Sequence, residues 1–75
     1  MTDLAGFSGK EVIKRLERIG YRITRQRGSH IRLKHPNGLV RKPITVPLHK
    51  ELKVGLLHEI LKDAGLEIEN FLDRT

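Results

Sequence analysis

The chain has 75 residues, which is enough for one small domain and leaves no room for a second. It contains no cysteine, so disulfide frameworks and thiolate metal sites are excluded and the fold must be held together by packing. The first residues lack the pattern of a signal peptide, and no apolar run approaches the roughly 18 residues of a membrane span, so we expect a soluble cytoplasmic protein.

The charge is unevenly distributed along the chain. The formal net charge is +6, yet residues 1–50 hold 12 Lys and Arg residues against three acidic residues, whereas residues 51–75 hold three against six. No acidic residue lies between Glu17 and Glu51. A basic segment without acidic residues is typical of a nucleic-acid-binding protein, because each neutralised phosphate releases a counterion and adds affinity. The alternative is a basic surface that serves only solubility.

A first helix is predicted over residues 9–19. Residues 1–7 show no periodic pattern and are predicted to form a loosely ordered lead-in. The segment from Ser8 to Glu11 then matches a capping box, in which both side chains bind backbone amides at the start of a helix. Apolar residues recur at helical spacing after it, and Gly20 suits the left-handed conformation that ends a helix.

Two strands flank the centre of the basic segment. Residues 21–26 alternate as a half-buried strand does, with the apolar residues on one face and Arg22, Thr24 and Gln26 on the other. A type I turn is predicted at residues 35–38, followed by a strand over residues 39–46. Pro43 interrupts this strand and cannot donate a ladder hydrogen bond, which favours an edge position or a bulge.

The strand between them is the most informative part of the sequence. It follows a turn at Gly28 and Ser29, and its alternation separates a cationic face (His30, Arg32, Lys34) from an apolar one. Histidine exchanges protons near neutral pH, and fixed positive charges stabilise phosphate oxygens. This face therefore suits chemistry on a phosphodiester.

A second helix is predicted from an apolar stripe that begins at Val54 and ends at Ala64, with Gly65 as the stop. Gly55 is better suited to the cap than to the helix interior. A short closing turn at residues 66–72 is expected to cover the core. The order of elements predicts an α+β fold of the type α-β-β-β-α, in which two helices lie on one face of a three-stranded antiparallel sheet and one domain spans residues 1–75.

Several motifs resemble those of the HicA family, the small RNA-cleaving toxins of bacterial and archaeal toxin–antitoxin pairs. They occur in order and cover nearly the whole chain: Ser8 to Val12, Gly28 to His30, Val46 to His49, Gly55 to Leu57, Ile60 to Leu61, Ala64 to Leu66, and Phe71 to Leu72. The resemblance implies a fold like that of the double-stranded-RNA-binding domain, mRNA as the substrate, a HicB-type antitoxin as the partner, and His30 as the catalytic residue. One departure is Leu56, where many members carry a threonine suited to capping the second helix.

The residues also support a role for His30 without the resemblance. RNA can be cleaved without a metal ion by its own ribose 2′-hydroxyl, so the protein need only move protons and stabilise the charged phosphorane. His30 is predicted to move protons, and the predicted substrate-binding residues are its neighbours: Arg27, Gly28, Ser29, Arg32 and Lys34. The alternative is that His30 is a solvated histidine and that Gly28 and Ser29 serve only the turn.

The other three histidines have weaker claims to a function. His49 follows the strand closed by Pro47 and is a candidate for a second proton-transfer residue. His35 is predicted to be a solvated turn residue, and His58 a surface or core-edge side chain of the second helix. No pair has metal-ligand spacing on a helix and the middle of the chain offers no carboxylate, so neither a metal ion nor a cofactor is expected.

The leading hypothesis is a metal-independent endoribonuclease toxin that cleaves mRNA, and two alternatives remain open. One is a non-catalytic module that binds structured RNA through the same charges. The other is a docking surface for another protein at an exposed edge strand. The only aromatic residues are Phe7, Tyr21 and Phe71, so the chain lacks a stacking platform for bases, which favours recognition of the RNA backbone.

Overall fold

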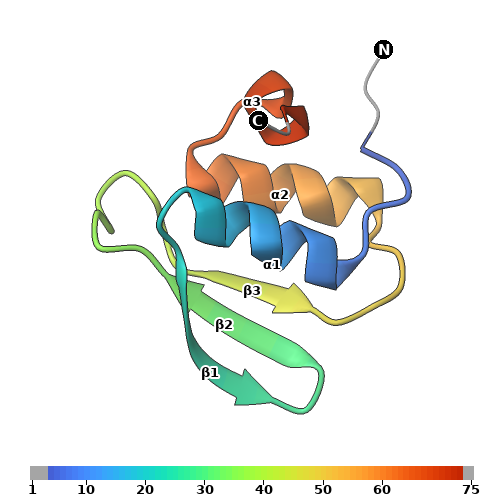
Figure 1. Ribbon diagram of the computed structural model, residues 1–75, viewed down its shortest axis with the longest axis horizontal. Coiled ribbons are helices and arrows are strands. Elements are labelled where there is room, and N and C mark those ends of the chain that lie inside the picture. The colour runs from blue at the N-terminus through green and yellow to red at the C-terminus, as the bar shows by residue number, and fades with distance from the viewer. Residues whose placement is uncertain (1–3, 74–75) are drawn as a thin grey trace.

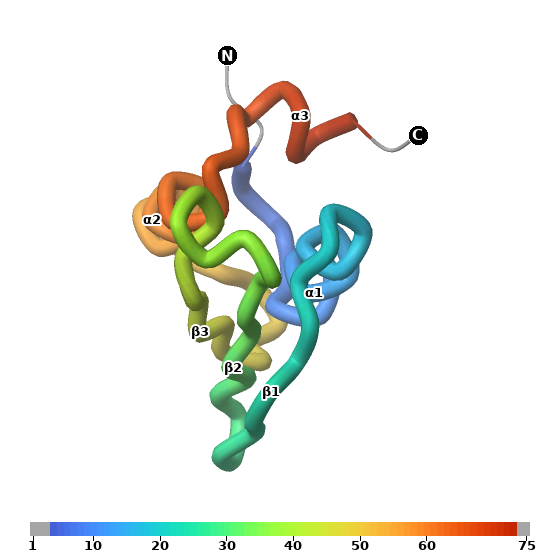
Figure 2. Tube along the Cα trace, turned by 90° about the vertical axis from the view of Figure 1, so that its left-hand side faces the viewer, coloured from blue at the N-terminus to red at the C-terminus, as the bar shows by residue number. Residues whose placement is uncertain are grey.

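The computed structural model describes residues 4–73, which form three helices and a three-stranded antiparallel sheet (Figure 1). The elements in chain order are α1 (Gly9–Arg18), β1 (Arg22–Arg27), β2 (His30–Lys34), β3 (Ile44–Pro47), α2 (Val54–Ala64) and α3 (Ile68–Leu72), and the strand order is β1-β2-β3. Helices α1 and α2 cover one face of the sheet, and α3 lies beyond them, away from the sheet (Figures 1 and 2). The predicted α+β fold is confirmed.

The core lies between the helices and the inner face of the sheet, which we define as the face toward α1 and α2. Every element except β1 contributes buried apolar side chains, and burying them supplies the main favourable term in folding. Strand β1 is exposed along its whole length, and Figure 2 shows that the β1–β2 hairpin extends past the helices. The part of the sheet farthest from the core is therefore the part that contains the Gly28–Ser29 turn.

Helix α1 starts with the predicted capping box. The Ser8 hydroxyl accepts a hydrogen bond from the Glu11 amide at 3.1 Å, and the Glu11 carboxylate accepts one from the Ser8 amide at 2.9 Å. The helix ends at Arg18, one residue earlier than predicted, with Ile19 as its C-cap. Gly20 follows at φ +107°, the left-handed region predicted for the stop.

The segment before α1 is more ordered than predicted. Residues 1–3 of the expected lead-in lie outside the described residues, but Leu4 is only 1% exposed and belongs to the core. The Phe7 carbonyl accepts a hydrogen bond from the Leu52 amide at 2.8 Å, and the Phe7 and Phe71 rings lie 5.0 Å apart. The Arg15 guanidinium lies 5.0 Å from the centroid of the Phe7 ring and 5.2 Å from that of the Phe71 ring. The expectation of a loose segment is therefore wrong for residues 4–7, because Leu4 and Phe7 pack against the core.

Strand β3 is shorter than predicted. It covers Ile44–Pro47, whereas the sequence predicts a strand from residue 39. The preceding residues instead cross the C-terminal end of α2, where the Arg41 guanidinium donates to the Ala64 carbonyl at 2.7 Å and the Lys42 amide donates to another carbonyl of the last turn. A cation at this end satisfies free carbonyls and matches the helix dipole. These contacts direct residues 39–43 away from the sheet.

Helix α2 ends as predicted, at Gly65, which has a left-handed φ of +66°. It begins at Val54, where the predicted apolar stripe begins, and its N-cap is Lys53, so Gly55 lies inside the first turn. The expectation that Gly55 lies at or before the cap is therefore wrong. Lys53 makes no side-chain capping hydrogen bond. Helix α3 then brings Phe71 into the core, in agreement with the predicted closing turn.

Candidate functional site

The β1–β2 hairpin places His30 at the first position of β2. Gly28 and Ser29 alone join the two strands, and Gly28 has φ +59°, as the first residue of a type II′ turn requires. His30 pairs with Arg27 of β1 on one side and with Pro47 of β3 on the other. The backbone of His30 is therefore held in the centre of the sheet while its ring stays exposed.

The predicted alternation of β2 is confirmed. Ile31 and Leu33 are 3% and 0% exposed on the inner face, whereas His30 and Lys34 are exposed and Arg32 is half-buried. Because the helices cover only the inner face, the outer face presents a histidine and two cations from one short strand. Within residues 4–73, no segment packs over this outer face.

A shallow hollow of about 230 Å³ surrounds His30 on the outer face, and we call it the cationic hollow. It is lined by five side chains: Arg25, Arg27, His30, Arg32 and Thr45. The Arg32 guanidinium donates to the Thr45 hydroxyl at 2.9 Å, which fixes its position next to the imidazole. No carboxylate lines the hollow. The three guanidinium groups of this hollow can bind a phosphate, and the imidazole can move a proton at it.

Arg25 lies in the hollow although the sequence pattern does not predict it. Ile23 pairs with Leu33 across the β1–β2 ladder, but Arg25 pairs with Arg32, so Thr24 is one extra residue in β1. Such a β-bulge reverses the faces of all residues that follow it in the strand.

The bulge corrects the predicted faces of β1. Strict alternation places Gln26 on the same face as Arg22, whereas Gln26 actually pairs with Ile31 of the inner face. That part of the prediction is wrong. The only local signal is that no apolar residue follows Ile23 in β1, so the sequence leaves the faces of the next residues undetermined.

The other predicted site residues lie outside the cationic hollow. Gly28 and Ser29 form the adjacent turn, and Lys34 lies at the far end of β2, on the same outer face but about 13 Å along the strand from His30. His49 lines a different hollow of about 300 Å³, together with Ser8, Lys10, Leu48 and Lys50. The structure therefore brings together His30, Arg27 and Arg32 and does not bring His49 into their hollow.

His35 is a structural residue and not a solvated one as predicted. Its Nε2 donates to the Ile19 carbonyl at 2.7 Å, and its Nδ1 accepts a hydrogen bond from the Asn37 amide at 3.0 Å. The ring also makes an edge contact with Tyr21, with 5.1 Å between the centroids. These contacts join the turn after β2 to the end of α1, a long-range arrangement that the local sequence does not reveal.

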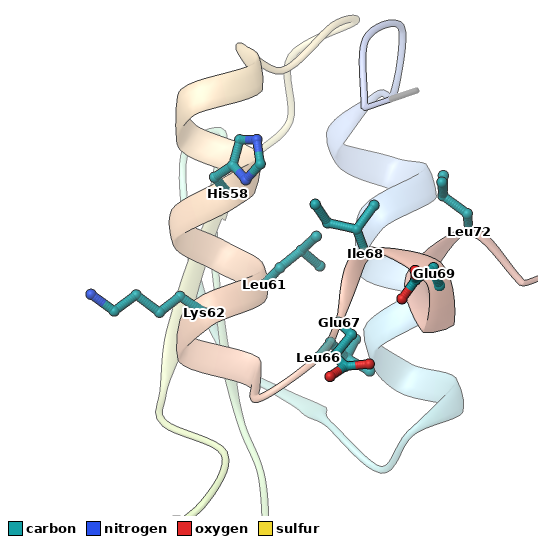
Figure 3. A pocket seen from close by; sticks show the side chains of 8 residues that line it. All are labelled: His58, Leu61, Lys62, Leu66, Glu67, Ile68, Glu69 and Leu72. Atoms are coloured by element: carbon teal, nitrogen blue, oxygen red, sulfur yellow. The ribbon is translucent and has the colours of Figure 1, made fainter. Parts of the chain in front are cut away.

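A larger hollow, of about 630 Å³, lies between α2 and α3 (Figure 3). His58 and Lys62 project from α2, and Glu67 and Glu69 belong to the N-terminal end of α3 (Figure 3). None of the predicted catalytic or substrate-binding residues lines it, and its two carboxylates would repel a phosphate. We therefore assign the candidate site to the cationic hollow in spite of its smaller volume.

The described residues, 4–73, contain neither a metal-binding cluster nor a membrane-spanning helix. No group of three or more His, Cys, Asp or Glu side chains in this range is arranged to hold a metal ion. None of the helices in this range is long and apolar enough to cross a membrane.

Comparison with protein families matches residues 9–66 to the HicA toxin of bacterial toxin–antitoxin systems. The matched segment starts at the first residue of α1, ends just after α2, and contains every residue of the cationic hollow. A comparison with curated proteins finds no match. Because the matched segment covers well over half of the 75 residues, the chain belongs to the HicA toxin family.

Proposed function

We propose that this chain is a metal-independent endoribonuclease that cleaves mRNA, with His30 as its proton-transfer residue and Arg27 and Arg32 of the cationic hollow as its phosphate-binding groups. Membership of the HicA family accounts for the coarser part, a toxin of a toxin–antitoxin system with a nuclease role. The observation that carries the finer part is the exposed His30 imidazole in a hollow lined by three arginines.

The proposed reaction uses the nucleophile that RNA itself carries. A ribose 2′-hydroxyl attacks the adjacent phosphorus, the bond from phosphorus to the 5′-oxygen breaks, and the products are a 2′,3′-cyclic phosphate and a 5′-hydroxyl end. His30 takes the proton of the 2′-hydroxyl, and the leaving 5′-oxygen takes up a proton. His49, which lines a separate hollow, is the candidate donor, and the variant His49→Ala tests it. Arg27 and Arg32 stabilise the negative charge of the phosphorane. DNA lacks the 2′-hydroxyl and is not a substrate.

The predicted residues outside the hollow extend the phosphate-binding surface. Ser29 lies at the turn next to His30, and Gly28 leaves that turn open because no atom lies within 4 Å of the position a Cβ would take. Lys34 continues the positive charge toward the other end of β2. RNA that follows β2 would therefore meet donors on both sides of the scissile phosphate.

The proposed partner is a HicB-type antitoxin that inhibits the toxin by covering the cationic hollow. The lining of the hollow carries positive charge and no carboxylate. A partner surface rich in Asp and Glu would therefore bind it quickly and exclude RNA from it.

Cleavage of a defined single-stranded RNA in the presence of EDTA tests the catalytic part. The wild type should produce ends with a 2′,3′-cyclic phosphate, and His30→Ala should cut about 10²–10⁴-fold more slowly. Because His30 is exposed, the variant should keep the wild-type circular dichroism spectrum and Tm. His58→Ala is the matched control and should cut at the wild-type rate. A His30→Ala variant that cuts as fast as the wild type contradicts the proposal.

The same assay separates the remaining questions. Loss of cleavage in His49→Ala supports its role as the second proton-transfer residue, whereas full activity removes it from the site. If no variant cuts RNA but all bind it with a steep salt dependence, the chain is a non-catalytic RNA-binding module. If RNA binding is weak at physiological salt and an antitoxin co-purifies, the sheet is chiefly a protein-docking surface.

A further inference from the structure

We propose that Arg25 is a further phosphate-binding residue of the cationic hollow and that the β-bulge at Thr24 is the feature that places it there. This inference rests on the proposed function, because it concerns the RNA that the hollow would bind. It adds a residue that neither the sequence pattern nor the family match assigns.

The register of the β1–β2 ladder shows what the bulge does. The first two pairs are Arg22 with Lys34 and Ile23 with Leu33. If this register continued without the extra residue, Arg25 would lie opposite Ile31, whose side chain is 3% exposed on the inner face. Directly opposed residues share a face, so Arg25 would then point away from His30.

The observed register places Arg25 on the other face. Arg25 pairs with Arg32, and Arg27 pairs with His30, so both arginines of β1 point to the outer face together with their partners. The lining of the cationic hollow includes both. One inserted residue therefore adds two guanidinium groups to the surface around the imidazole.

The residue inserted at the bulge contacts the neighbouring strand β2. The Thr24 hydroxyl donates to the Arg32 carbonyl at 3.4 Å, so the extra residue makes a weak contact with the residue that Arg25 faces. Bulges of this kind re-aim side chains and occur often beside functional sites.

The charge pattern indicates what the re-aimed side chain binds. Arg25, Arg27 and Arg32 line the hollow together, and their like charges repel one another. An anion between them removes this repulsion. The planar guanidinium forks match phosphate oxygens in pairs. The hollow thus suits the phosphodiester of RNA better than it suits any neutral ligand.

The test measures binding of a single-stranded RNA by variants made in the His30→Ala background, so that the RNA stays intact. Fluorescence anisotropy at several salt concentrations gives Kd and the slope of log Kd against log salt. Arg25→Gln should bind severalfold more weakly at low salt, and the slope should fall by about 0.7, the value for one lost contact to a single strand. Lys14→Gln removes one exposed charge from α1 and should change neither quantity.

A double variant with the same amino-acid composition as its parent tests the role of the bulge. Arg25→Gln combined with Gln26→Arg moves the guanidinium by one residue, to the position that pairs with Ile31 of the inner face. This double variant should bind RNA as weakly as Arg25→Gln. Gln26→Ala serves as its control, because the Gln26 amide donates to the Gly28 carbonyl at 3.1 Å and this bond is lost in the double variant.

Two results would overturn the inference. One is an Arg25→Gln variant with the parent affinity and salt slope, and the other is recovery of binding in the double variant. If the His30→Ala parent itself binds no RNA, then the proposed function fails, which is a different outcome from failure of Arg25 alone.

Discussion

Replacing Gly9 with alanine should destabilise the fold and disturb the site together. Gly9 is the first residue of α1, and a Cβ there would lie 2.0 Å from the Pro47 carbonyl oxygen and 3.1 Å from the Leu48 Cα. Real Cβ atoms do not come closer than 3.0 Å, so α1 and the end of β3 would have to separate by about 1 Å, from 2.0 Å to 3.0 Å. Both contacts are backbone atoms, which cannot turn aside as a flexible side chain can.

The expected cost of Gly9→Ala is about 2–4 kcal/mol. Overpacking of this kind costs roughly 1–3 kcal/mol, and the Gly9 amide also risks its 3.0 Å hydrogen bond to the His49 carbonyl, which is about 1 kcal/mol. Urea unfolding followed by circular dichroism measures the loss. Cleavage should fall as well, because Pro47 pairs with His30 and moves with the end of β3.

Gly55→Ala is the matched control for this change. Gly55 also lies in the first turn of a helix, but no atom lies within 4 Å of the position its Cβ would take. Alanine should therefore stabilise the fold by about 0.4–1 kcal/mol, since it only reduces the freedom of the unfolded chain. If Gly9→Ala proved as stable as the wild type, or if both substitutions shifted the unfolding midpoint equally, the described contact between α1 and β3 would be incorrect.

The remaining predictions concern the contacts at the end of α1. Burial raises the pKa of Tyr21 above its ordinary value of 10.0. The positive charge of Arg41 lowers this pKa and the negative charge of Asp63 raises it, but burial is the largest of the three effects. The stability from its neutral phenol is thus complete below pH 10.0 and is lost as pH rises through the folded-state pKa. The unfolding free energy of Tyr21→Phe should therefore fall less steeply than that of the wild type as pH rises above 10.0. Tyrosinate absorbance reports the titration of Tyr21 alone, because the chain has one Tyr and no Trp. Gly20→Ala should lower the unfolding free energy by about 1–3 kcal/mol through its left-handed backbone, with a further loss because its Cβ would lie 2.8 Å from the His35 imidazole. The second loss should disappear in a His35→Ala background, and equal effects in both backgrounds would contradict this contact.

The features that the sequence predicted well are those that local chemistry decides. The capping box at Ser8, the stop at Gly65 and the turn at Gly28 each depend on a few neighbouring residues. The alternation of β2 was also predictable, because Ile31 and Leu33 must both face the core. These features were sufficient to place His30 on the exposed face of a sheet.

The features that the sequence did not predict depend on contacts between distant segments. Arg41 leaves the predicted third strand because its partner is the end of α2, 23 residues away. His35 appears solvated until the Ile19 carbonyl lies beside it. The bulge at Thr24 escaped prediction for a different reason: β1 buries none of its residues, so no apolar pattern reports which way Arg25 points.

The uncovered outer face of the sheet separates the residues that hold the domain together from the residues of the proposed site. The side chains of the cationic hollow contribute little to the core, and exposed substitutions typically change stability by no more than about 0.5 kcal/mol. If these side chains act as proposed, selection can silence, retune or restore the activity through residues such as His30 or Arg32 without endangering the fold that displays them. A copy inactivated at one of these residues would then keep its fold, and a single reverse substitution would restore the proposed activity.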